Sequence, residues 1–184
     1  MSRNALVLIF LILAISYPAL AVNGKVESIA AFSDQSAPES VRKILEAKGY
    51  RVTLADGSVV CEVWLRAGLV PASKSETQGA VYTSLSVSAM IGVISFPKAA
   101  NDFRGQSVKA GAYTLRYAVH PLDGNHLGIS PIRDFLVLIP VTADQNPETE
   151  YKFDDLMKMS MKASGTNHPA VISLANVEGD PAAG

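Results

Sequence analysis

The sequence predicts a mostly β protein, an antiparallel β-sandwich with one N-terminal helix and one short late helix. About five segments have the pattern of strands, and several of them alternate apolar and polar residues with the period of two of a half-buried strand. Polar connections rich in glycine, proline and asparagine separate these segments. Only two segments show helical spacing, so strands do not alternate with helices as they would in a parallel α/β sheet.

Residues 1–21 show the three-part pattern of a secretory signal peptide. Arg3 supplies a positive charge, residues 5–15 form an uncharged apolar run, and residues 19–21 (Ala-Leu-Ala) place small side chains where signal peptidase cleaves. The apolar run is shorter than the roughly 20 residues that cross a bilayer, which favours cleavage near Ala21 over a retained anchor. We therefore expect the mature chain to be periplasmic or secreted.

The composition fits one globular domain with a buried core. The chain has 184 residues, of which 48% are hydrophobic and 18% are charged. Its formal net charge is -1, so it does not attract a polyanion strongly and we expect no nucleic-acid partner. We expect a signal peptide over 1–21, one β-sandwich domain over 22–175 and a disordered tail over 176–184, with no membrane span after cleavage.

The N-terminal part of the mature chain predicts a helix. Residues 22–35 are weakly patterned and fit either a strand or an ordered arm. Ser36 and Glu39 match a capping box, and Pro38 stands in the first turn. Gly49 follows the last residue of the helical pattern, so we expect about three helical turns that end there.

A β-hairpin should follow this helix. Asp56-Gly57 is a strong two-residue turn signal between strands at 50–54 and 58–66. Cys61, the single cysteine, lies on the apolar face of the second strand and is expected to be a buried thiol. Trp64 lies on the opposite, mixed face, where it would either cover a sheet edge or line a binding surface.

The second half of the chain predicts more strands and the late helix. The strands span 81–97, 112–119, 134–141 and 169–175. Tyr113 follows a turn glycine, a position from which a tyrosine hydroxyl can bond to nearby backbone. A helix is expected over 154–163, with Gly165 as its stop signal.

Several segments resemble a group of uncharacterised exported bacterial proteins. They are CEVWLR at 61–66, GVISFP at 92–97, DFRGQSVKAGAYTLRYAVHPLDGNHLG at 102–128, RDFLVLIP at 133–140 and SGTNHPAVISL at 164–174. A fainter likeness extends to a broader bacterial domain of unknown function in which a Glu-Val-Trp segment precedes a Gly-x-Tyr strand. The resemblance implies an exported bacterial β-domain and supplies no catalytic residue.

The loop after the 112–119 strand holds a candidate metal site. His120, Asp123 and His126 lie in this loop, and His168 would be a third imidazole if the fold brought it close. Neutral imidazole and carboxylate ligands suit zinc or copper. Because this spacing matches no standard metal motif, we favour the alternative that hydrogen bonds and turns simply pin the loop.

Alternating methionines in the late helix form a second candidate, for Cu(I). Thioethers are soft ligands, and Met157, Met159 and Met161 occur close together. On a helix, however, Met157 and Met161 share a face while Met159 points elsewhere. Core packing is the simpler explanation, and we favour it.

The motifs of catalysis are weak, which favours a binding role. Ser130 lacks the Gly-x-Ser-x-Gly elbow of a nucleophilic serine, and Cys61 in an apolar strand would be a poor nucleophile. Trp64 and Arg133 are the residues we expect on a binding surface. We therefore expect an exported, non-enzymatic binding or structural module of the bacterial envelope, without a cofactor, whose partner is an envelope protein or a small ligand. The alternative is a zinc- or copper-binding protein that uses the 120–126 loop and His168.

Overall fold

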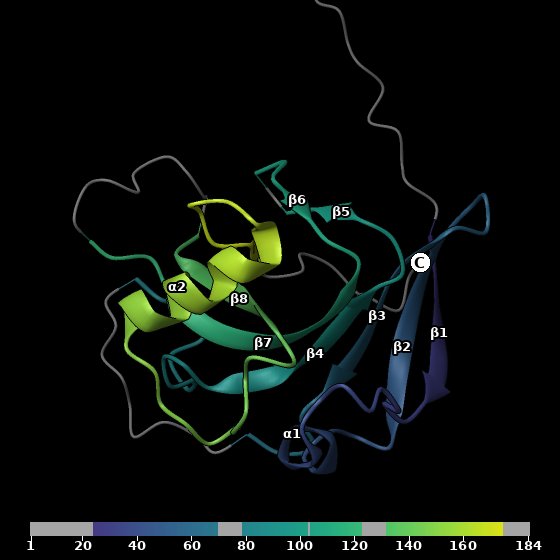
Figure 1. Cartoon of the computed structure of the whole chain (residues 1–184), viewed down its shortest axis with the longest axis horizontal. Helices are drawn as coiled ribbons and strands as arrows, with labels where there is room; N and C mark the ends of the chain where they lie inside the picture. Colours follow the sequence, from purple (N-terminus) through teal and green to yellow (C-terminus); the bar gives the residue numbers. More distant parts are fainter. Residues whose placement is uncertain (1–23, 70–78, 103, 123–131, 175–184) are drawn as a thin grey trace, which may run out of the picture.

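The computed structural model describes residues 24–69, 79–102, 104–122 and 132–174. Its centre is a seven-stranded antiparallel sheet in the order β1-β2-β3-β4-β7-β8-β9 (Figure 1). These strands are β1 (Gly24–Ala30), β2 (Lys48–Leu54), β3 (Val59–Leu65), β4 (Met90–Phe96), β7 (Gly111–Val119), β8 (Asp134–Pro140) and β9 (Val171–Ser173). The predicted signal peptide at 1–21 and the predicted tail at 176–184 lie outside the described residues.

The mostly β, antiparallel architecture is confirmed, but the stacked second sheet of a sandwich is not found among the described residues. The other sheet there is a small hairpin of β5 (Ala100–Asn101) and β6 (Ser107–Val108). The strand predicted over 81–97 begins only at β4, because Ser88 has a φ of 78° that breaks an extended chain. The segment before it turns repeatedly and packs Tyr82 and Leu85 against the sheet as an irregular cover.

The first helix, α1 (Glu39–Lys43), is shorter than the three turns predicted, and Ser36 does not cap it. Gly49 is not a helix stop but a residue of β2, where the ring of Trp64 lies against it. A Cβ atom at Gly49 would come within 2.4 Å of Trp64 Nε1, so this close approach requires glycine. The chain leaves the helix early because residues 48–54 pair with both β1 and β3.

Two local predictions in the strands are confirmed. Gly57 takes a φ of 83° in the turn between β2 and β3, and Asp56 Oδ1 accepts a hydrogen bond from Ser58 N at 2.8 Å. Tyr113 closes the corner before β7, because its hydroxyl donates to Lys109 O at 2.7 Å. These contacts set where the central strands begin and turn.

The late helix, α2 (Phe153–Ser164), lies across one face of the sheet over β8 (Figure 1). Leu156 is fully buried and packs in one apolar cluster with Phe135 and Val137. Ser160 Oγ donates to Ala170 O at 2.9 Å and joins the helix to the start of β9. Gly165 ends the helix in the left-handed conformation with a φ of 69°, as predicted. Within the described part of the chain, no helix is both long enough and apolar enough to span a membrane.

Candidate functional site

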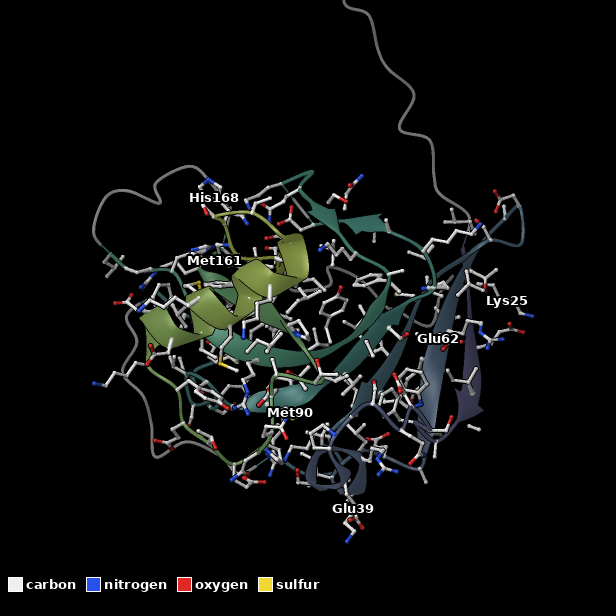
Figure 2. All side chains as sticks on the ribbon, in the orientation of Figure 1. Lys25, Glu39, Glu62, Met90, Met161 and His168 are labelled. Atoms are coloured by element: carbon white, nitrogen blue, oxygen red, sulfur yellow. The ribbon has the colours of Figure 1, made fainter. Side chains whose placement is uncertain are left out.

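A pocket of about 440 Å³ lies beside α2. On the sheet side it is lined at the end of β7 and at the first residues of β8 and β9. Most of its lining is apolar, with an arginine and two histidines added. Figure 2 shows Met161 and His168 at this end of the molecule, far from Lys25 on β1. The lining residues are Arg104, His120, Phe135, Phe153, Met157, Met161, His168, Pro169 and Val171.

One stripe of α2 forms the helical wall of the pocket. Phe153, Met157 and Met161 are spaced by four residues, so they follow one another along a single helix face. The neighbouring stripe, which includes Leu156 and Ser160, is buried and holds the helix on the sheet. The stripe of α2 with Leu156 and Ser160 therefore packs on the core, and the adjacent stripe lines the pocket. The prediction that Met157 and Met161 share a face is confirmed.

The sheet supplies an aromatic floor. Phe135 stands on β8, and its ring stacks on the imidazole of His120 with centroids 4.2 Å apart and planes 23° apart. The backbone of His120 is fixed at the end of β7, because His120 N donates to Arg133 O at 2.9 Å. Val171 on β9, the strand paired with β8, extends this floor.

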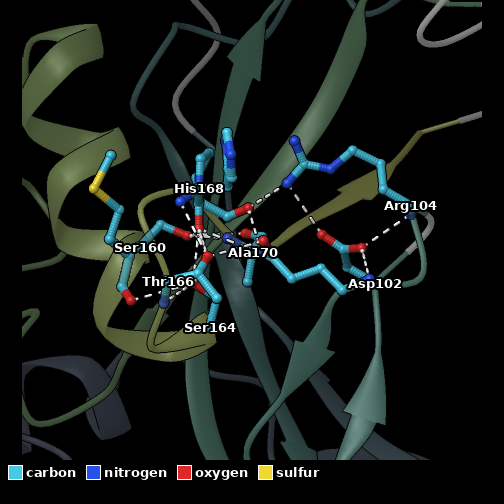
Figure 3. Close-up of polar contacts among 10 residues, drawn as sticks. Asp102, Arg104, Ser160, Ser164, Thr166, His168 and Ala170 are labelled. Atoms are coloured by element: carbon cyan, nitrogen blue, oxygen red, sulfur yellow. Dashed lines mark hydrogen bonds and ion pairs between the residues drawn. The ribbon is translucent and has the colours of Figure 1, made fainter.

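Two turns that contribute to the lining of the pocket are hydrogen-bonded to each other (Figure 3). Ser164 Oγ donates to His168 O at 2.7 Å, which shapes the turn after α2. Gln106 Nε2 donates to Pro169 O at 3.1 Å, and an Arg104 guanidinium nitrogen donates to the same oxygen, so the β5–β6 turn is joined to it. These bonds use the backbone of 168–169 and leave the exposed imidazole of His168 at the rim.

Asp102 holds Arg104 in place within the β5–β6 turn. Its buried carboxylate accepts hydrogen bonds from Arg104 N and Gln106 N, both at 2.9 Å, and forms an ion pair of 3.2 Å with Arg104 Nη2. The Arg104 side chain remains 32% exposed. The guanidinium is therefore held by the Asp102 carboxylate, and Arg104 still lines the pocket.

The structure brings two of the four predicted metal ligands together. His120 and His168 line the same pocket, although they are far apart in the sequence. Asp123 and His126 lie outside the described residues. Within the described part of the chain, no group of three or more His, Cys, Asp or Glu side chains is placed to hold a metal ion.

Trp64, predicted at a binding surface, is instead part of the core. It is only 6% exposed, its ring packs edge-on against Phe32 with centroids 4.9 Å apart, and Nε1 donates to Ala30 O at 2.9 Å. The mixed strand face that suggested exposure is covered by α1 and by the segment after β1. Trp64 is therefore a core residue that stabilises the fold, and it does not line the pocket beside α2.

Arg133, the other residue predicted on a binding surface, is half-buried and lies next to His120. Its Nε donates to His120 O at 2.9 Å, so it supports the residue that lines the pocket. Its neighbour Asp134 is fully buried and accepts hydrogen bonds from Val81 N at 2.9 Å and Tyr117 Oη at 2.6 Å. These contacts attach the irregular cover to the sheet.

Cys61 is half-buried and is an unsuitable nucleophile. Burial raises the pKa of its thiol, and the neighbouring Glu62 carboxylate raises it further. Cys61 does not line the pocket beside α2.

Sequence reasoning missed the apolar wall and the arginine of the pocket. The four-residue spacing of Phe153, Met157 and Met161 was a usable signal, because it marks a second stripe beside the buried one. Arg104 had no comparable local signal. It reaches the pocket only because the β5–β6 turn meets residues more than 60 positions later in the chain.

Comparison with protein-family models, with curated proteins and with solved structures found no match to this chain. Function is therefore inferred from the geometry of its own residues.

Proposed function

We propose that this chain is an exported, non-enzymatic binding protein of the bacterial envelope, whose ligand is a small, mostly apolar molecule held in the pocket beside α2. The observation that carries the proposal is the lining itself. Phe153, Met157 and Met161 form one wall and Phe135 and Val171 form the floor, and the polar lining is limited to Arg104, His120 and His168 among the described residues. Small-molecule sites combine such an apolar interior with a few oriented polar groups.

The size and chemistry of the pocket support binding over catalysis. Its volume of 440 Å³ lies near the lower end of the range of about 300–1,000 Å³ that such sites occupy, so the ligand is compact. Methionine side chains adapt their shape to a guest. Among the described lining residues there is no serine, cysteine, lysine or carboxylate to act as a nucleophile.

The neutral fluorescent probe N-phenyl-1-naphthylamine tests this proposal. We expect it to bind the purified mature protein, and Met161→Gln to weaken binding by about five-fold, because the change places an amide against the apolar ligand. Met159→Gln is the matched control, since Met159 lies on the same helix but does not line the pocket. Equal effects of the two substitutions, or no binding by the wild type, would refute the proposal.

The exported part of the proposal is supported by the leader pattern and by the resemblance to exported bacterial proteins. Expression of the full chain in a Gram-negative host should give a periplasmic protein whose first residue is Val22. Mass spectrometry of the periplasmic fraction measures this. A full-length product that stays in the cytosol would contradict it.

A metal-binding function is the second candidate, and the shared pocket favours it. His120 and His168 line the pocket together with Met157 and Met161, and imidazole with thioether is a donor set that suits Cu(I) better than zinc. Metal analysis of protein purified from the periplasm tests it. Less than about a tenth of an equivalent of zinc or copper, with no uptake of added Cu(I), would end this candidate.

A further inference from the structure

The pocket beside α2 adjoins a second, open cavity at the surface. That cavity has a volume of about 340 Å³ and is lined by Arg104, Gly105, Gln106 and His168. Arg104 and His168 also line the apolar pocket, so the two spaces adjoin at these side chains. A ligand that fills the apolar space therefore ends between a guanidinium and an imidazole.

The charges around this junction favour an anion. The described residues that line the two spaces include one arginine and two histidines, and they include no aspartate or glutamate. The carboxylate that pairs with Arg104 is that of Asp102, whose side chain is fully buried. It accepts hydrogen bonds from two backbone N–H groups in addition to its ion pair with the guanidinium, and it does not line either space.

We propose that the ligand is an amphipathic carboxylate, with its apolar part between α2 and the sheet and its carboxylate at Arg104 and His168. This inference rests on the proposed function and names the class of ligand. Arginine suits the role because its planar guanidinium matches a carboxylate in shape and charge. The anchored position of Arg104 matters as well, because little side-chain freedom is lost when the ligand binds.

Three eight-carbon compounds test the charge preference without changing the tail. Octanoate, octanol and octylamine are each used to displace N-phenyl-1-naphthylamine at neutral pH. We expect octanoate to displace the probe at a concentration about ten-fold lower than octylamine, because only octanoate places opposite charge beside Arg104. Equal potency of the two, or a preference for octylamine, in the wild type would overturn the inference.

Substitution of Arg104 locates the preference. Arg104→Gln should reduce the octanoate-to-octylamine ratio to within about two-fold of unity, because the guanidinium that would pair with the carboxylate is removed. Arg104→Lys should retain part of the preference. Arg51→Gln is the matched control, since Arg51 also pairs with a carboxylate, that of Glu62 at 2.6 Å, but on β2 and β3 far from the pocket. An unchanged ratio in Arg104→Gln would overturn the inference.

The design separates this inference from the proposed function. Displacement by octanol with no preference for octanoate would leave an apolar pocket without an anion site. Failure of the probe to bind is followed by direct calorimetry with octanoate, and no heat of binding there would refute both proposals. Folding of Arg104→Gln is checked by thermal unfolding, and we expect it to fold because the backbone bonds to Asp102 do not use the guanidinium.

Discussion

Two arginine–aspartate pairs hold loops to this molecule, and they differ in how far they are buried. Arg116 on β7 and Asp144 after β8 both have side chains that are 0% exposed, with Nε and Oδ2 2.7 Å apart. Asp102 and Arg104 lie within the turn between β5 and β6, with Oδ2 and Nη2 3.2 Å apart and the arginine side chain 32% exposed. The same two residue types therefore serve as an internal anchor in one region and as the rim of a pocket in the other.

The buried pair uses every donor of its guanidinium. Arg116 donates two bonds to Asp144, at 2.7 Å each, and three to backbone carbonyl oxygens. Those oxygens belong to Ser88, Asn146 and Thr149, at 2.7–2.8 Å. One side chain thus fixes two loops to the sheet. A guanidinium engaged in this way is a structural group, whereas Arg104 lies where a ligand can reach it.

Removal of the buried arginine should have the largest effect. Arg116→Met leaves Asp144 as a buried carboxylate without its cation and should lower the free energy of unfolding by about 3–5 kcal/mol. Urea unfolding measures this loss. Asp144→Leu combined with Arg116→Met should recover part of it, because the unpaired charge is then removed. A loss below about 1 kcal/mol in the free energy of unfolding for Arg116→Met would refute the claim that the buried pair is an internal anchor.

A third buried carboxylate, that of Asp134, sharpens the comparison because it accepts its hydrogen bonds from neutral donors. Tyr117→Phe removes the hydrogen bond of 2.6 Å to Asp134 and should cost about 1–3 kcal/mol at neutral pH, less than loss of Arg116. Two backbone N–H groups, at 2.9 and 3.0 Å, continue to serve the carboxylate. Urea unfolding again measures the change, and a loss equal to that of Arg116→Met would contradict the ranking.

Tyr117 also predicts a pH dependence. Burial raises the pKa of its phenol, and the hydrogen bond to Asp134 raises it further. The folded state therefore retains the proton longer than the unfolded chain, whose tyrosine pKa is about 10. This contribution to stability is complete below that pH and declines as the pH rises past it. Unfolding of the wild type between pH 9 and 11 should lose stability more steeply than that of Tyr117→Phe, and parallel curves would refute this.

The parts of the fold that depend on local signals were predictable. The period-two segments mark β2, β3 and β7, and the apolar run over 134–141 marks β8. The helical spacing marks α2, which ends at Gly165 because a left-handed residue ends the helix. Tyr113 likewise closes a corner with a carbonyl four residues away. Each of these features is decided by residues that are close in the sequence.

The rest depends on contacts between distant residues. The alternation over 81–89 imitates a strand, but Ser88 turns there and its carbonyl serves Arg116, a requirement that local pattern does not carry. Gly49 matches a helix stop signal in the sequence, but in the fold it is a residue of β2 against which the Trp64 ring packs. The pocket was predictable in part, because His120 and His168 were singled out, whereas Arg104 reaches it only through the packing of two turns.

The smallest loss of stability is expected at the rim of the pocket. Arg104→Gln should lower the free energy of unfolding by less than about 1 kcal/mol, because a partly exposed ion pair is screened by water. Asp102 retains its two backbone donors and becomes accessible to solvent when the guanidinium no longer covers it. Urea unfolding of this variant beside Arg116→Met compares the two pairs directly. If Arg104→Gln lowers the free energy of unfolding as much as Arg116→Met does, Arg104 is a structural anchor like Arg116. That result would count against its role in ligand recognition.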